Sequence, residues 1–173
     1  MNTLAFIYQL PEEDLRGKDV GNHILRLKYL MVKFRYENGA YATEVKSNSQ
    51  YIKLTSIKDP KCLESMDILL KAGDFLENLE LSDEEFEAYK LPLLKKKSRD
   101  TSSFLNEKLG TTKDQQQKRD AIISTTLAQV REYGKFLQKN TEKGFFVVEA
   151  NSECLAQLKS RGFTILQNRR KNV

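Results

Sequence analysis

The sequence has few of the residues from which metal centres and disulfide frameworks are built. Its 173 residues include one histidine, two cysteines and no tryptophan. His23 alone cannot form a two-histidine zinc site, and any Ser-His-Asp triad would have to use it. Cys62 and Cys154 are 92 positions apart, too far for the short cysteine pair of a zinc ribbon, so we expect two buried free thiols. The sequence therefore predicts no metal site of its own.

Long apolar runs are missing as well. The longest covers residues 4–8, against the roughly 18 residues of a membrane-spanning helix, so we expect a soluble chain that does not contact a membrane. The first ten residues contain no lysine or arginine and precede three acidic residues at 12–14, which does not fit a secretory or organellar leader. The length suits one core. We assign residues 1–167 to a single domain and residues 168–173 to a basic tail.

Charge is distributed unevenly along the chain. Residues 1–90 hold 12 basic and 16 acidic side chains, whereas residues 91–173 hold 17 and 8. The densest basic cluster is formed by Lys95, Lys96, Lys97 and Arg99. It has no interleaved aromatic residues and fits no nucleic-acid-binding motif. We therefore expect a solvated helix surface or an interface with an acidic neighbouring domain, and no nucleic-acid partner.

Hydrophobic periodicity predicts an α+β domain, with a mostly antiparallel sheet of four or five strands covered by helices. The expected strands are residues 3–10, 40–46, 51–57, 144–149 and 163–167, the second and third forming a β-hairpin. Asp19 is expected to cap the first helix, and Asn38 with Gly39 to end it. The buried stripe of this helix is predicted to be Val20, Ile24, Leu27, Met31 and Phe34. His23, beside this stripe, is expected to be a partly buried structural residue.

Capping signals predict further helices in the middle and near the end of the chain. A helix is expected to start at Asp59 and Pro60 and to bury Leu63, Met66, Leu70, Gly73 and Leu76. Capping boxes pair Ser82 with Glu85, Thr112 with Gln115 and Thr126 with Gln129. Pro92 is expected to kink or end its helix. Asn151 is predicted to cap a last helix, which Gly162 ends.

Two short segments carry a resemblance to a known family. They are Arg35-Tyr36-Glu37-Asn38-Gly39-Ala40-Tyr41 and Ser56-Ile57-Lys58-Asp59-Pro60, the second preceding a long amphipathic helix. They resemble the C-terminal half of the pitrilysin/insulinase zinc metallopeptidases, in the presequence protease and falcilysin branch. There, an arginine at a helix end is followed after two residues by Gly-Gly-Ala-Tyr-Gly, and later by Ser-Tyr-Arg-Asp-Pro. Asn38, Ala42, Ile57 and Lys58 depart from this pattern, but the later segments follow in similar order over nearly the whole chain.

The resemblance implies a fold and a role in a larger enzyme. Family members have the LuxS/mitochondrial-processing-peptidase-like metallohydrolase fold, and their two halves close as a clamshell around an unfolded peptide. The N-terminal half carries the His-x-x-Glu-His motif that holds zinc. This chain lacks the motif, so we expect zinc in the parent enzyme, none in this chain, and no activity of the chain alone. Its partners would be the catalytic half and unfolded peptides, in an intracellular or organellar compartment.

The same resemblance assigns Arg35 and Tyr41 to contacts with the substrate and its transition state, and Asn38, Gly39 and Ala40 to substrate binding. A phenol and a guanidinium stabilise a developing oxyanion more than they stabilise the planar peptide group. The residues alone also allow simpler interpretations. A cation in the last turn of a helix is favoured by the helix dipole, a strand tyrosine is commonly a core or cross-strand residue, and Asp59 is explained as a helix cap.

An alternative function is a free-standing binding or scaffold protein that keeps the fold and lacks protease activity. A His-x-x-Glu-His motif upstream in the same reading frame would favour the peptidase domain, whereas a natural start at Met1 would favour the scaffold.

Overall fold

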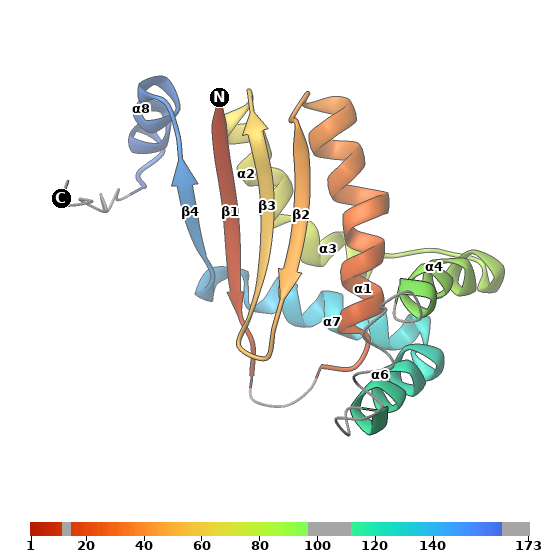
Figure 1. Ribbon diagram of the computed structural model, residues 1–173. Helices are drawn as coiled ribbons and strands as arrows, with labels where there is room; N and C mark the ends of the chain where they lie inside the picture. Colours follow the sequence, from red (N-terminus) through yellow and green to blue (C-terminus); the bar gives the residue numbers. More distant parts are fainter. Residues whose placement is uncertain (12–14, 97–111, 164–173) are drawn as a thin grey trace.

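The computed structural model describes residues 1–11, 15–96 and 112–163, whose strands form one antiparallel sheet (Figure 1). Its order is β2-β3-β1-β4, with bounds β1 (Asn2–Gln9), β2 (Ala42–Ser47), β3 (Tyr51–Asp59) and β4 (Phe145–Glu149). The predicted α+β class, the hairpin and four of the five expected strands are confirmed. The fifth strand, beyond its first residue, and the basic tail lie outside the described residues.

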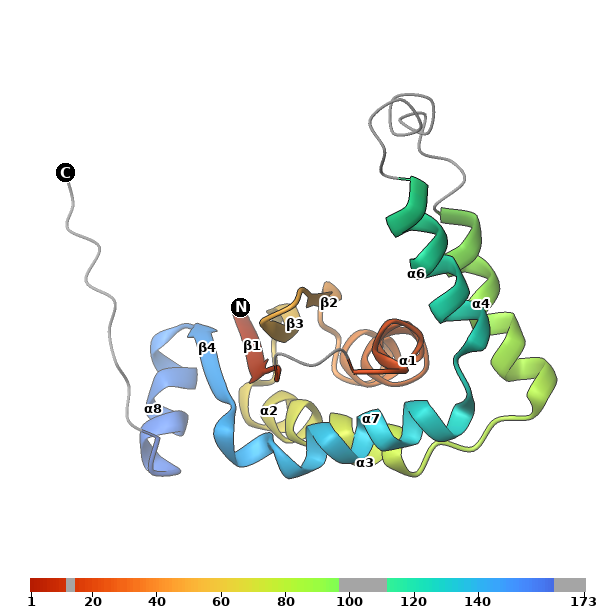
Figure 2. The ribbon, with the colours of Figure 1, turned by 90° about the horizontal axis from the view of Figure 1, so that it is seen from below.

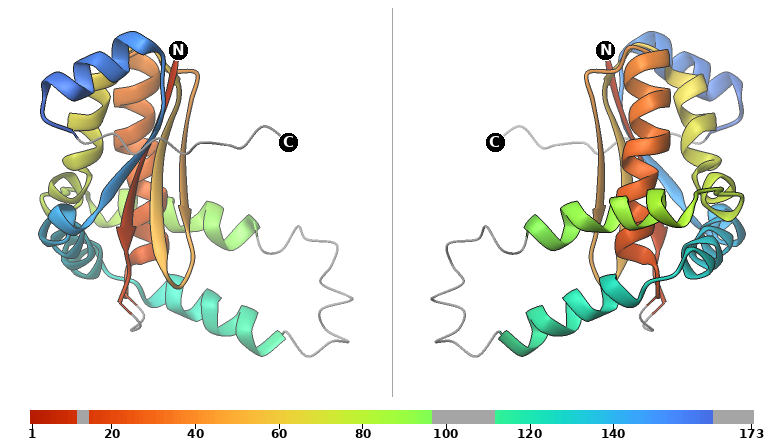
Figure 3. Two further views of the ribbon diagram at one scale, coloured as in Figure 1. Left: turned by 90° about the vertical axis from the view of Figure 1, so that its left-hand side faces the viewer. Right: turned by 90° about the vertical axis from the view of Figure 1, so that its right-hand side faces the viewer.

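Helices cover one face of this sheet (Figure 3). They are α1 (Lys18–Ile24), η1 (Leu25–Glu37), α2 (Cys62–Leu70), α3 (Ala72–Glu77) and α7 (Leu127–Lys139). The short η2 (Thr141–Lys143) precedes β4, and α8 (Ser152–Ser160) follows it. Two further helices, α4 (Asp83–Lys96) and α6 (Thr112–Ser124), lie side by side and project away from the sheet (Figure 2). None of the helices in the described part of the chain is long and apolar enough to cross a membrane.

The central strand β1 shows why helices cover only one face. Leu4, Phe6 and Tyr8 alternate along it and are no more than 2% exposed. The Tyr8 hydroxyl donates to a backbone carbonyl oxygen in α2, so these side chains face the helices. On the opposite face, Phe145 and Val147 of β4 are 48% and 51% exposed. The sheet thus has one face packed against helices, whereas its other face exposes large side chains of the edge strand β4.

The first helix begins differently from the prediction. Gly17 occupies the N-cap in the left-handed conformation (φ 83°), and Asp19 lies inside the first turn without a capping hydrogen bond. A Cβ at Gly17 would lie 2.7 Å from the carbonyl oxygen of Gln129 in α7. Both the backbone conformation and the close approach of α7 require glycine here, so the expected cap at Asp19 was wrong.

The buried stripe of the first helix also changes phase along its length. Val20, Ile24 and Phe34 are buried as predicted, but Leu25 and Leu30 replace Leu27 and Met31, which are only partly buried. From Leu25 onward the segment η1 is π-helical, and its wider turn moves the core-facing side by one to two residues. A constant α-helical period could not predict this shift.

The next helix starts later than predicted, because β3 continues to Asp59. The N-cap of α2 is Lys61, and the helix begins at Cys62 rather than at Pro60. A break at Lys71 separates α2 from α3. In the predicted stripe Met66, Gly73 and Leu76 are buried, and Leu63 and Leu70 are half-buried.

Two glycines allow α3 and α7 to cross with their backbones in contact. A Cβ at Gly73 would lie 2.5 Å from the amide nitrogen of Gln138, and a Cβ at Gly134 would lie 2.6 Å from the carbonyl carbon of Leu76. Contacts this short involve backbone atoms, which cannot move aside as a side chain can. The crossing therefore requires both glycines.

We expect Gly134→Ala to lower the free energy of unfolding by about 1–3 kcal/mol, because the added methyl group overpacks the helix crossing. Lys135→Ala, at the exposed neighbouring position on α7, serves as the control and should change stability by less than about 0.5 kcal/mol. Urea titration followed by circular dichroism measures both values. Equal stability of the two variants would contradict the proposed tight crossing.

The predicted capping signals hold at three helix starts. Ser82 with Glu85 and Thr126 with Gln129 form reciprocal capping boxes, and the Asn151 side chain accepts a hydrogen bond from the third residue after it. The side chains of the Thr112 box lie outside the described residues.

The prediction for Pro92 was wrong in part, because α4 runs through this proline to Lys96. Pro92 is exposed, so water can satisfy the carbonyl that loses its partner. Of the basic cluster, Lys95 lies exposed near the end of this helix, whereas Lys97 and Arg99 lie outside the described residues.

The two cysteines form a disulfide, contrary to the prediction of free thiols. Cys62 starts α2 and Cys154 lies in the first turn of α8, with their Cα atoms 5.7 Å apart. The two positions are 92 residues apart in sequence, so only the tertiary fold brings them together. The bond links α8, which follows the edge strand β4, to the helical layer.

We expect the double substitution Cys62→Ser and Cys154→Ser to lower the free energy of unfolding by about 2–4 kcal/mol, because the cross-link restrains a long loop in the unfolded chain. Denaturant titration with and without a reducing agent measures the effect. A thiol assay on the denatured, unreduced chain is the direct check. Two reactive thiols in that assay would contradict the disulfide.

Candidate functional site

Arg35 and Tyr41 lie on the two sides of one tight connection between η1 and β2. Arg35 is exposed in the last turn of η1, and the Tyr41 side chain, immediately before β2, is 69% exposed. The backbone N–H of Ala40 donates to the carbonyl oxygen of Phe34 (2.8 Å), which closes the connection. The N–H of Tyr41 then donates to the carbonyl oxygen of Ile57 in β3 (3.0 Å). The backbone positions of both residues are therefore fixed, while their side chains face solvent.

The three residues expected to bind substrate have different environments within this connection. Gly39 has a positive φ of 78° and is exposed, which confirms its role in ending the helix. Ala40 is 3% exposed, and its N–H is already bonded within the connection. The Asn38 side chain is half-buried and donates to the Ser65 hydroxyl (3.1 Å). Among these three residues, only Gly39 offers an open surface to a ligand.

Lys58 belongs to this site, although sequence reasoning gave it no role. Its ammonium nitrogen lies 5.2 Å from the centroid of the Tyr41 ring. Its backbone has a positive φ of 50°, a conformation that lysine rarely adopts. The only sequence signal was its place in the segment that resembles Ser-Tyr-Arg-Asp-Pro, where it stands at the arginine position.

Asp59 anchors the strand end behind Lys58. Its side chain is fully buried and accepts hydrogen bonds from the Ser56 hydroxyl and from the N–H of Lys61. Its backbone carbonyl oxygen accepts a hydrogen bond from the Asn2 side chain (3.1 Å). Asp59 therefore orders the turn that precedes α2. The prediction that it is the N-cap of that helix was wrong, because the N-cap is Lys61. The carboxylate holds the strand end rather than the helix start.

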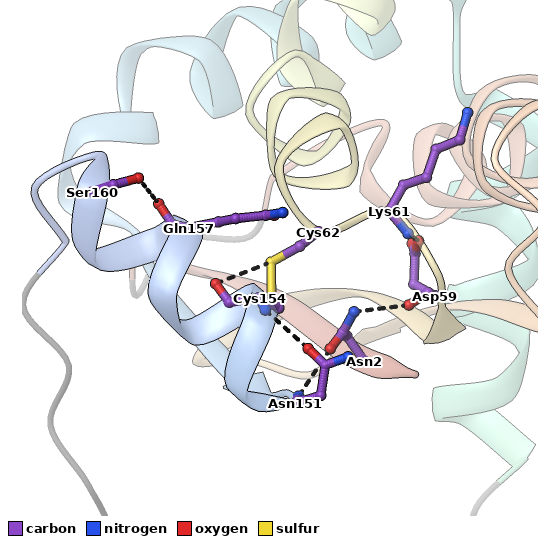
Figure 4. The surroundings of a disulfide bond; sticks show 8 residues. All are labelled: Asn2, Asp59, Lys61, Cys62, Asn151, Cys154, Gln157 and Ser160. Carbon is purple, nitrogen blue, oxygen red and sulfur yellow. Dashed lines mark hydrogen bonds between the residues drawn. A yellow bond between two sulfur atoms is a disulfide. The ribbon is translucent and has the colours of Figure 1, made fainter.

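The same network extends to the last helix (Figure 4). The Oδ1 atom of Asn2 accepts a hydrogen bond from the N–H of Asn151 (3.1 Å), and the Asn151 side chain accepts one from the N–H of Cys154 (2.9 Å). The disulfide between Cys154 and Cys62 then connects α8 to the start of α2. The start of β1, the end of β3 and the start of α8 thus meet at one end of the sheet, adjacent to Lys58.

The described residues do not fit a zinc site. They contain no group of three or more His, Cys, Asp or Glu side chains that could hold a metal ion. Both cysteines are used in the disulfide, and the half-buried His23 packs edge-on against Tyr89 (6.4 Å between ring centroids). The expectation of a structural histidine is thereby supported by its packing.

A large cavity of about 830 Å³ lies elsewhere, at the opposite end of the sheet. It is bordered by the hairpin turn at Ser47–Ser49, by Arg16 in the segment before α1, and by residues of α1, α6 and α7, including Lys118. Because β3 runs from this end to Asp59, the length of the sheet separates the cavity from Tyr41. The cavity is therefore not a part of the Arg35 and Tyr41 site.

Comparison with known proteins agrees with the sequence resemblance. The chain is 28% identical over 139 residues to presequence protease 1, chloroplastic/mitochondrial, of Arabidopsis thaliana. The chain is therefore a homologue of part of this presequence protease. The aligned region covers 72% of this chain and 12% of the Arabidopsis protein, so the chain spans a small part of that relative's length. No family model matches the chain.

Solved structures share the fold. A protein described as a zinc protease from Bordetella pertussis Tohama I matches with a TM-score of 0.64 and 15% identity, over 88% of this chain and 95% of that one. An inactive M16 peptidase domain from Pseudomonas fluorescens matches with a TM-score of 0.58 and 16% identity, over 85% and 40%. At these identities the comparison supports the fold and not an activity, and it confirms the predicted architecture.

We expect Ser56→Ala to lower the free energy of unfolding by about 1.5–3 kcal/mol, because the buried carboxylate of Asp59 loses one of its two hydrogen-bond donors and keeps only the backbone N–H of Lys61. Ser160→Ala, which removes an exposed hydroxyl bonded to a backbone carbonyl, should cost less than about 0.5 kcal/mol. Thermal and urea denaturation of both variants provide the comparison. A Ser56 variant as stable as the control would refute the anchoring role of Asp59.

Proposed function

We propose that residues 1–167 form one domain, followed by a basic tail at 168–173, in the C-terminal half of a larger zinc peptidase of the presequence protease and falcilysin branch. The domain is non-catalytic by itself and closes the chamber around an unfolded peptide. The observation that carries this proposal is the exposure of Arg35 and Tyr41 on one rigid helix-to-strand connection, at the spacing that the family uses. The Pseudomonas fluorescens neighbour, described as inactive, is consistent with a non-catalytic domain.

The chemistry of the two side chains suits contact with a peptide carbonyl group. When water adds to a peptide carbonyl, negative charge develops on the oxygen. A phenol and a guanidinium donate hydrogen bonds to that oxygen more strongly as its charge grows, which lowers the barrier rather than merely tightening binding. The rigid connection fixes where the donors start, so less reorganisation is needed at the moment of reaction.

The partner in this proposal is the catalytic half of the same peptidase. That half would supply the zinc and the group that activates water, since the described residues of this chain provide no metal cluster. An upstream His-x-x-Glu-His motif in the same reading frame is the simplest sign of such a partner. A chain that proves to be complete at Met1 would instead support the free-standing scaffold.

We expect Tyr41→Phe in the complete peptidase to lower kcat by about 10²- to 10³-fold with a smaller change in KM, because the lost hydroxyl acts mainly in the transition state. Tyr51→Phe is a matched control, because Tyr51 is also an exposed tyrosine of the hairpin but lies at the far end of β3. Steady-state cleavage of an unstructured peptide measures both constants.

Turnover of the Tyr41 variant within about twofold of the unmodified enzyme would remove the substrate-contact role. The isolated chain provides a second check, because it should neither bind zinc stoichiometrically nor cleave peptides. Either activity in the isolated chain would contradict a purely supporting domain.

A further inference from the structure

The end of β3 contains a bulge directly opposite the start of β1. Asn2 pairs with Asp59 and Leu4 pairs with Ser56, so β1 advances two residues while β3 advances three. The extra residue lies in the segment that includes Lys58, the one non-glycine residue of the described chain with a positive φ. Bulges of this kind bend a strand and redirect a side chain.

Hydrogen bonds fix the bulge from both sides. The Ser56 hydroxyl donates to the buried carboxylate of Asp59 across the bulge, and the Asn2 side chain donates to the Asp59 carbonyl oxygen. Lys58 therefore keeps an unfavourable backbone conformation, because the residues on either side are held by buried contacts. Glycine would adopt this conformation without cost, so a lysine here indicates a use for its side chain.

The redirected side chain reaches Tyr41. The Lys58 ammonium lies 5.2 Å from the centre of the phenol ring, within the range of a cation–π contact. The N–H of Tyr41 donates to the carbonyl oxygen of Ile57, the residue before Lys58, so the backbones of the two residues are also joined. The ring is 69% exposed and has this contact to restrain it at the surface.

We propose that Lys58 is a positioning residue for Tyr41. Its ammonium holds the phenol ring in one orientation and adds positive charge near the ring, whose hydroxyl would donate to the oxygen of a bound peptide. This inference rests on the proposed function for its catalytic consequence, whereas the contact itself is a property of the isolated chain. The two parts can therefore be tested separately.

The contact is tested by NMR on the isolated chain. A side chain above an aromatic ring experiences its ring current, so the ε-methylene protons of Lys58 should resonate upfield of those of Lys53, a residue of the same strand. Tyr41→Leu should abolish this upfield shift, and Tyr41→Phe should retain it. An unshifted Lys58 in the unmodified chain would overturn the proposal.

The variant Lys58→Gly distinguishes a role of Lys58 in positioning Tyr41 from a role in stabilising the fold. Glycine relieves the left-handed backbone, so the melting temperature should stay the same or rise. In the complete peptidase the same variant should lower kcat by about two- to fivefold, the factor expected for an exposed cation–π contact. A fall in melting temperature with unchanged kcat would assign Lys58 a structural role and overturn the proposal.

Charge and coupling are tested with three further single variants and one double variant of the complete peptidase. Lys58→Met should reproduce the loss in kcat, and Lys58→Arg should restore most of it, whereas the control Lys53→Met should have no effect. Combined with Tyr41→Phe, Lys58→Met should cause little additional loss, because it acts through the tyrosine hydroxyl. Equal losses in both backgrounds would overturn the positioning role. Unchanged turnover in Tyr41→Phe alone would instead refute the proposed function.

Discussion

The hydrogen-bonded, buried carboxylate of Asp59 is the feature on which the end of the domain that carries the candidate site depends. A fully buried charge is costly unless hydrogen bonds replace the water that it loses. The Ser56 hydroxyl and the Lys61 amide provide those bonds, and the Asn2 side chain binds the backbone of the same residue. The end of β3 cannot shift without breaking these buried hydrogen bonds. Lys58, which directly precedes Asp59, is held in place by the same constraint.

Long-range links make this end of the sheet a junction of distant segments. Asn2 bonds to Asp59, which is 57 residues away, and to Asn151, which is 149 residues away. The disulfide adds a connection over 92 residues between α2 and α8. Because the first strand, the third strand and the last described helix are joined here, local movement at any one of them is opposed by the other two. The Tyr41 connection is bonded to this rigid frame through Ile57.

The parts of the fold that the sequence predicted depend on neighbouring residues. The capping boxes at Ser82 and Thr126 involve partners three residues away, and the hairpin depends on the pattern of two adjacent strands. Two of the incorrect predictions concern distant partners. Gly17 is an N-cap because α7 packs on it, and the cysteines pair because the helical layer brings α8 to α2. Local pattern carries no information on such contacts.

The same division applies to the candidate site. Arg35 and Tyr41 were found from a short motif, and the structure places both at the surface of one connection. The contact of Lys58 with Tyr41 could not be predicted, because it depends on a bulge that exists only when β3 pairs with β1. A register inferred for the hairpin alone would have shown that the two residues lie opposite each other. It would not have shown the left-handed backbone that directs the lysine toward the ring.

Exposure of the donors explains why such a domain would need a partner to take part in catalysis. In water, a phenol or a guanidinium that forms a hydrogen bond to another group gives up a hydrogen bond to water. The net stabilisation from the new bond is therefore only about 0.5–1.5 kcal/mol. Enclosure by a second half would remove the competing water and strengthen every interaction with a developing charge. The isolated domain therefore has rigid positions for Arg35 and Tyr41 but no dry environment for them. In the proposed peptidase, closure of the chamber would convert the fixed geometry of this connection into stabilisation of the transition state.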